Sequence, residues 1–165
     1  MDKEEIIKEI EKTKEHLANM EKMLEDCECE RWNPKPSEEY YCVDDGNDVR
    51  RVNFNIMNAY DRDRIKTYNC FRTKEEAEQE AEKILVRRQL EDIARRLNKG
   101  NKIDWNNYKQ FKYYIWMNSR DNEISWAGEV SHISQGVVYC SDRNFYIAAV
   151  KEIGEERLIK YLRGE

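Results

Sequence analysis

The chain has few of the residues that interrupt secondary structure and few of those that perform acid–base catalysis. Its 165 residues include only six glycines, two prolines and two histidines. The longest apolar runs fall well short of the roughly 18 residues that span a bilayer, and the opening Met-Asp-Lys-Glu-Glu is unlike an export signal. Ten tyrosines, four tryptophans and four phenylalanines argue against a disordered polymer. We therefore expect a folded cytoplasmic protein without a membrane partner.

The motifs of common enzyme and cofactor sites are also missing. The sequence has no phosphate-binding loop, dinucleotide fingerprint, zinc-protease helix, serine-hydrolase elbow or EF-hand. The five cysteines are an odd number, and the spacing of Cys27 and Cys29 does not match a zinc site. We predict reduced thiols, no metal, no cofactor and no catalytic residue. His132 with Glu129 or Cys140 leaves a hydrolase of a phosphate compound as an alternative.

The negative charge is concentrated at the N-terminus. Residues 1–30 hold eleven acidic residues and five lysines, whereas residues 31–165 have a net charge of +1. Apolar residues in the first segment recur with heptad spacing and include Ile6, Ile10, Leu17, Met20 and Leu24. Such a narrow apolar seam buries little against a globular core. We predict a helix over 1–30 that forms a coiled coil with a second copy, making a homo-oligomer; packing against the chain's own body is the alternative.

The remainder of the chain contains an internal repeat. Trp-Asn, followed after six residues by Tyr-Tyr, occurs at 32–41 and again at 105–114. Each copy continues with a β-hairpin, a short third strand and a helix capped by Thr73 or Asp142. The sequence therefore predicts an α+β fold in which two duplicated β-β-β-α modules follow the N-terminal helix. The predicted segments are 1–30, 31–100 and 101–165.

The helix after Thr73 has two apolar stripes on opposite faces. Ala77 and Ala81 lie on one face of its first half, whereas Val86 and Leu90 begin a stripe on the other face of its second half. We expect the first half to cover its own hairpin and the second half to pack on another unit. Asn-Lys-Gly at 98–100 predicts the end of this helix.

Basic residues gather in the first module. Residues 50–72 contain six basic and two acidic residues, with tyrosine and phenylalanine interspersed. This composition is typical of a phosphate, nucleotide or single-stranded nucleic acid site, and also of a solvated surface whose arginines pair with Asp61 and Asp63. The residues predicted to bind an anionic ligand are Arg50, Arg51, Arg62 and Arg64.

Two tryptophans flank the turn of the second hairpin. Trp116 precedes this turn and Trp126 follows it. We expect one of them to lie in the core and the other to be an exposed aromatic residue available for binding.

Several segments carry a resemblance to a known group of proteins. They are the acidic start of the chain and residues 69–78, 104–115 and 153–162. Together they resemble small accessory proteins encoded by temperate phages and mobile elements of low-GC Gram-positive bacteria. The resemblance implies a phage protein in the host bacterial cytosol and transfers no catalytic residue. Small proteins in this genomic setting often block host defence.

These observations favour a non-enzymatic phage protein that acts as an anti-defence inhibitor by stoichiometric binding of a host defence protein. Stoichiometric binding needs a surface and no reaction. The alternatives are sequestration of a nucleotide signal, binding of single-stranded nucleic acid, and a structural or regulatory role in the phage.

Overall fold

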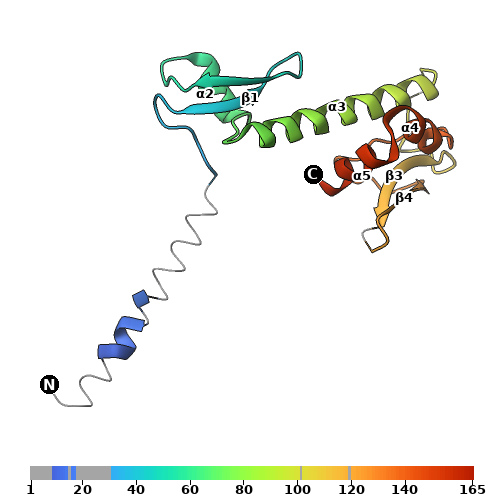
Figure 1. The fold of residues 1–165 in the computed structure, drawn as a ribbon. Helices are drawn as coiled ribbons and strands as arrows, with labels where there is room; N and C mark the ends of the chain where they lie inside the picture. The colour runs from blue at the N-terminus through green and yellow to red at the C-terminus, as the bar shows by residue number, and fades with distance from the viewer. Residues whose placement is uncertain (1–8, 15, 18–30, 101, 119) are drawn as a thin grey trace.

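The computed structural model describes residues 9–14, 16–17, 31–100, 102–118 and 120–165. In this part the chain is a mixed α+β protein with two separate antiparallel two-stranded sheets, which confirms only the α+β class of the predicted fold (Figure 1). The elements, in chain order, are β1 (Glu39–Val43), β2 (Val49–Asn53), α2 (Ala59–Lys66), α3 (Lys74–Leu97), β3 (Lys112–Asn118), β4 (Glu123–Glu129), α4 (Phe145–Ile153) and α5 (Glu155–Arg163).

A small part of the predicted N-terminal helix lies among the described residues. Residues 9–14 and 16–17 are helical, and the side chains of Ile10 and Leu17 are exposed. Ile6, Met20 and Leu24, which belong to the same predicted seam, lie outside the described residues.

Both predicted hairpins are present. β1 pairs with β2, and β3 pairs with β4. Each turn contains an asparagine in the left-handed region, Asn47 with φ 72° and Asn122 with φ 57°. Asparagine tolerates this conformation better than most residues, so a polar turn with this residue suits a tight reversal.

The predicted third strands are shorter than expected, and their alignment differs by one residue. Each is a single bridge to the first strand of the hairpin, between Tyr41 and Phe71 and between Tyr113 and Cys140. The equivalent of Tyr41 is therefore Tyr113, whereas the Tyr-Tyr alignment predicted Tyr114. A shift of one residue exchanges the two faces of a strand, so this difference changes which side chains correspond.

α3 links the two hairpins (Figure 1). It starts with the predicted capping box, in which Thr73 Oγ1 accepts from the Glu76 N–H and the Glu76 carboxylate accepts from the Thr73 N–H. Ala77 and Ala81 are buried, and the Asn47 side chain donates to the Ala81 carbonyl across the first hairpin. The helix ends before Gly100, which has φ 80°. The predicted division of this helix between two packing partners is confirmed.

The larger core lies around the second half of α3. Leu90 and Ile93 pack there with Ile115 of β3, Phe145 of α4 and Leu158 of α5. A smaller core in the first hairpin contains Tyr40, Cys42, Phe54 and Cys70. The second half of α3 therefore belongs to the larger core, whereas its first half lies against β1 and β2.

The prediction that Asp142 caps the second helix was wrong in detail. α4 begins at Phe145 after Asn144, whose side chain makes no capping bond. The Asp142 carboxylate instead accepts from the Asn144 N–H, and its carbonyl accepts from the Phe145 N–H. The carboxylate thus orders the turn that leads into α4.

The chain forms α2 between the first hairpin and α3, a helix that the sequence pattern did not indicate. Asn58 caps this helix by accepting from the Tyr60 N–H. The sequence of α2, Ala-Tyr-Asp-Arg-Asp-Arg-Ile-Lys, has no apolar stripe at helical spacing, so no periodic signal reveals it. Its position is set by the buried side chain of Asp61, which reaches β1.

Candidate binding surface of the second hairpin

The predicted arginine site is dispersed in the structure. Arg50 and Arg51 are neighbours on β2, so their side chains leave opposite faces of the hairpin. Arg50 Nε lies 2.6 Å from Asp44 Oδ2, and Arg51 lies 3.7 Å from Glu39 Oε2. Both arginines thus have an acidic neighbour within their own hairpin.

The two arginines of α2 also form hydrogen bonds within the first module. Arg62 donates to the Ile56 carbonyl at 2.8 Å. Arg64 donates to Asp61 Oδ1 at 3.1 Å and to the Tyr40 hydroxyl at 3.0 Å. Burial, followed by the hydrogen bond to Asp61, raises the pKa of the Tyr40 phenol well above its usual range. Arg64 balances the charge of a buried carboxylate, which limits its availability to a ligand.

The expectation that one tryptophan of the second hairpin is in the core was wrong. Trp116 is 41% exposed and Trp126 is 49% exposed. Trp126 lies opposite Ile115, on the face that packs against α4 and α5, whereas Trp116 lies opposite Ser125 on the other face. Neither is enclosed because the helices cover only part of the hairpin.

Three aromatic side chains form a continuous row on the face that carries Trp126. The rings of Phe111 and Tyr113 are stacked with centroids 6.2 Å apart, and Tyr113 meets Trp126 edge-on at 5.6 Å. Phe111 is 53% exposed. We call Phe111, Tyr113 and Trp126 the aromatic row. The aromatic row continues the apolar face of the core onto the exposed surface of the hairpin.

Gly128 allows this row to form. It is the cross-strand partner of Tyr113, and a Cβ atom at this position would lie 3.1 Å from the Phe111 ring and 3.2 Å from the Tyr113 ring. The missing side chain lets both rings lie over the strand. Sequence reasoning missed Phe111 and Tyr113, although a glycine within a predicted strand is a known signal of close approach.

A polar groove adjoins the row. It has a volume of about 390 Å³ and includes Tyr113, Lys99, Arg143 and Asp142 in its lining. Within the described ranges, neither Lys99 nor Arg143 forms an ion pair. The row thus has an apolar centre and a margin with two cations and one carboxylate.

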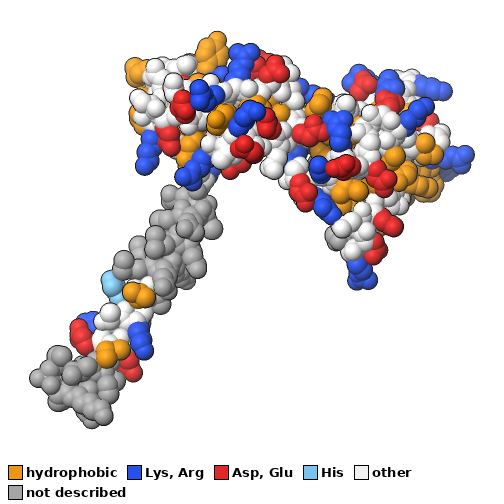
Figure 2. Space-filling model, viewed as in Figure 1, with side chains coloured by type: hydrophobic (Ala, Val, Ile, Leu, Met, Phe, Trp, Pro, Cys, Tyr) orange, Lys and Arg blue, Asp and Glu red, His pale blue; other side chains and the backbone are white. Residues whose placement is uncertain are grey.

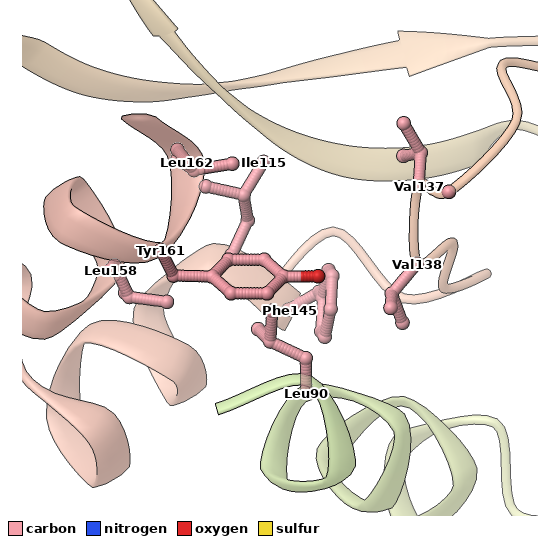
Figure 3. A pocket seen from close by; sticks show the side chains of 9 residues that line it. Leu90, Ile115, Val137, Val138, Phe145, Leu158, Tyr161 and Leu162 are labelled. Carbon is pink, nitrogen blue, oxygen red and sulfur yellow. The ribbon is translucent and has the colours of Figure 1, made fainter. Parts of the chain in front are cut away.

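The larger core contains a small apolar cavity. Its volume is about 60 Å³. Figure 3 shows the Tyr161 ring between Leu158 of α5 and Val138 of the loop before α4. Ligand pockets usually have volumes of roughly 300–1,000 Å³, so this cavity is a packing feature and too small for a metabolite.

A second exposed apolar group lies in the first module. Figure 2 shows hydrophobic side chains at the surface of both lobes. In the first lobe, Ile56, Met57 and Tyr60 are exposed around the start of α2. Among the described residues, Tyr60 stacks on no other ring, and Ile56 and Met57 are flexible side chains, so this surface is less ordered than the aromatic row.

The residues of the hydrolase alternative are not arranged as a catalytic pair. His132 is largely exposed and lies 3.4 Å from Glu129. The backbone N–H groups of Val130 and Ser131, and then His132, lower the pKa of Glu129 to about 2. Cys140 is buried, its sulfur contacts Asn98, and burial raises the pKa of its thiol. A carboxylate this acidic is a poor general base at neutral pH.

Among the described residues, no group of three or more His, Cys, Asp and Glu side chains could hold a metal ion. None of the described helices is both long enough and apolar enough to cross a membrane.

Comparison with known proteins gives no match to a family model, to a curated protein or to a solved structure.

Proposed function

We propose that this chain is a non-enzymatic binding protein that engages another protein through the aromatic row. The observation that carries the proposal is the exposure of Phe111 and Trp126 on either side of Tyr113, on the face that elsewhere forms the core. Rigid aromatic side chains are enriched at the centres of protein interfaces, where they contribute much of the binding energy.

A protein partner fits this surface better than a nucleic acid does. Residues 31–165, which carry this surface, have a net charge of only +1, which gives little attraction for a polyanion. The arginines of the alternative site are engaged within the first module. Lys99 and Arg143 at the margin of the row would favour a partner surface that has carboxylates around an apolar centre.

The wider role rests on the resemblance to small phage proteins. In that setting, the partner would be a host defence protein that is inhibited by stoichiometric binding in the bacterial cytosol. Sequestration of a nucleotide, binding of single-stranded nucleic acid and a structural or regulatory phage role are the alternatives.

The duplication of the modules and the pairing of the N-terminal helix are also part of this proposal. We interpret the two hairpins, each with a bridge from its first strand to the segment before a helix, as two copies of one module. The exposed Ile10 and Leu17 are seven residues apart, a spacing that favours pairing of the N-terminal helix with a second copy. Two copies would present two aromatic rows and increase avidity for a repetitive or dimeric partner.

The proposal can be tested by affinity capture from a lysate of a low-GC Gram-positive bacterium. Wild-type protein should retain a defined protein in a fixed molar ratio. Trp126→Ala should lose it, whereas Ile147→Ala, an exposed apolar residue on α4, should keep it. Loss with Trp116→Ala but not with Trp126→Ala would place the interface on the opposite face. Capture of a nucleotide or oligonucleotide alone would contradict the proposal.

A further inference from the structure

Two cysteines face each other across neighbouring strands in the core of the first module. Tyr41 and Phe71 exchange both backbone hydrogen bonds, each 2.9 Å long, so they form a hydrogen-bonded antiparallel pair. In such a ladder, the adjacent residues form a non-hydrogen-bonded pair whose side chains lie on the same face. That pair is Cys42 and Cys70, and both are free thiols buried in one apolar cluster.

The alignment of this pair is fixed on its other side as well. The Asn69 side chain accepts from the Val43 N–H at 2.8 Å and donates to the Val43 carbonyl at 2.6 Å. These two bonds replace the backbone pair that would follow in a regular ladder. Cys42 and Cys70 are therefore held between two pairs of hydrogen bonds, which prevents one strand from sliding along the other.

In the second module, other residues occupy the corresponding cross-strand position, and their contact shows how close two side chains come there. Tyr113 and Cys140 form the corresponding hydrogen-bonded pair. The adjacent residues are Tyr114 and Tyr139, whose ring centroids are 5.4 Å apart. Side chains at this position contact each other directly in the second module, and the same geometry brings the two thiols together in the first.

We infer that Cys42 and Cys70 form a redox modification site at which a peroxide produces an intramolecular disulfide across the strands. Opposed residues of a non-hydrogen-bonded pair have Cα atoms about 4.5 Å apart. Disulfides need a Cα separation of roughly 4.4–6.8 Å. The separation lies at the short end of this range, so the bond would be easier to reduce than a relaxed structural disulfide.

The reaction balances with one peroxide per pair. Cys70 is 7% exposed as a residue and Cys42 is fully buried, so the Cys70 sulfur is the one that attacks a peroxide oxygen. The O–O bond breaks, water leaves, and Cys70 becomes a sulfenic acid. The Cys42 sulfur then attacks the Cys70 sulfur, the S–O bond breaks, and a second water leaves. Two thiols are oxidised, and one hydrogen peroxide is reduced to two waters.

The environment of the thiols makes this reaction slow at neutral pH. Burial raises the pKa of Cys70 to about 11 and raises the pKa of Cys42 as well. The thiolate is the reactive form, so oxidation should accelerate as the pH rises toward these values. The pair would respond to sustained oxidation and not to a brief pulse.

The disulfide would close a chain segment that contains β2 and α2. Because both cysteines already lie in register, the bond restricts the unfolded chain more than it alters the native one. We therefore expect the oxidised protein to unfold at a higher temperature than the reduced protein, by several degrees, with reversal by dithiothreitol.

The site can be tested in the full chain with Cys27 and Cys29 replaced by serine, so that they cannot compete. Hydrogen peroxide at pH 7 and at pH 9 should remove two hydrogen atoms from the protein mass, faster at pH 9. Peptide mapping without reductant should link Cys42 to Cys70. Cys140→Ser should behave identically, and Cys42→Ala should instead accumulate a dimedone-reactive sulfenic acid at Cys70. Full retention of both thiols at pH 9, or linkage of either to Cys140, would overturn the inference.

Discussion

The Tyr40 hydroxyl donates a 2.7 Å hydrogen bond to Asp61 Oδ1, and both side chains are fully buried. The second carboxylate oxygen accepts from the Asn55 N–H at 2.9 Å. Asp61 thereby ties β1, the segment after β2 and α2 together, and Arg64 supplies the opposite charge. This network is the main polar connection inside the first module.

Replacing Tyr40 with phenylalanine should destabilise the first module. The change removes a donor from a buried carboxylate and leaves the packing of the ring intact, so the free energy of unfolding should fall by about 1–3 kcal/mol. Tyr41→Phe is a matched control, because Tyr41 lies on the same strand and its hydroxyl makes no hydrogen bond to another described residue. Urea unfolding followed by far-UV circular dichroism measures both. Equal effects of the two variants would show that the Tyr40 hydroxyl contributes nothing specific.

Replacing Leu90 with alanine should destabilise the larger core. Leu90 is buried beside the 60 Å³ cavity, and its truncation would enlarge that cavity at a cost of about 2–5 kcal/mol. Leu85→Ala makes the same chemical change on the same helix at an exposed position and should cost far less. Thermal unfolding of the two variants gives the comparison. If Leu85→Ala costs as much as Leu90→Ala, the assignment of the apolar stripe on α3 is wrong.

The features predicted correctly from the sequence depend on neighbours within a few residues. Thr73 and Glu76 form a capping box with each other, and 98–100 contains its own helix stop. α2 was missed because its position depends on Asp61 and Tyr40, which are 21 residues apart. Short-range patterns cannot reveal a helix that is held by one distant polar contact.

Part of the candidate site could likewise be predicted from the sequence, and part could not. The predicted arginine cluster reflected only closeness in the sequence, because the side chains of Arg50 and Arg51 point to opposite faces of one strand. The aromatic row depends on the pairing of Tyr113 with Gly128. Once the turn between β3 and β4 is placed, this pairing follows by counting along the two strands, so the row could be found by following the hairpin register residue by residue. The extent to which α4 and α5 cover the row requires the tertiary structure.

Stability should depend on pH through Glu129. In the native protein its pKa is lowered from 4.5 to about 2, so its contribution is full above about pH 4.5 and disappears as the pH falls through 2. Glu129→Gln keeps an acceptor for the Val130 and Ser131 N–H groups but removes the charge. The variant should be less stable than the wild type at pH 7 and equal to it near pH 2. A constant difference across this range, measured by urea unfolding, would exclude an ionic contribution.

Oligomer formation should depend on Ile10 and Leu17. Both side chains are exposed, and two aspartates in their place would bring negative charges together in a paired helix. Light scattering should show a smaller assembly for the Ile10→Asp, Leu17→Asp variant with an unchanged circular dichroism spectrum of the body. Ile147→Asp, at an exposed position of α4, is the control and should leave the mass unchanged. An oligomer of the same mass in both variants would place the interface elsewhere.

The most direct test of the aromatic row is calorimetric titration of its purified partner with variants of single row residues. Truncation of a central aromatic residue at an interface costs about 2 kcal/mol or more, so Trp126→Ala and Phe111→Ala should each weaken binding roughly thirtyfold or more. Ile147→Ala should bind within about twofold of wild type, and all three variants should keep the wild-type unfolding temperature within a few degrees. Wild-type affinity in both Trp126→Ala and Phe111→Ala would contradict the account.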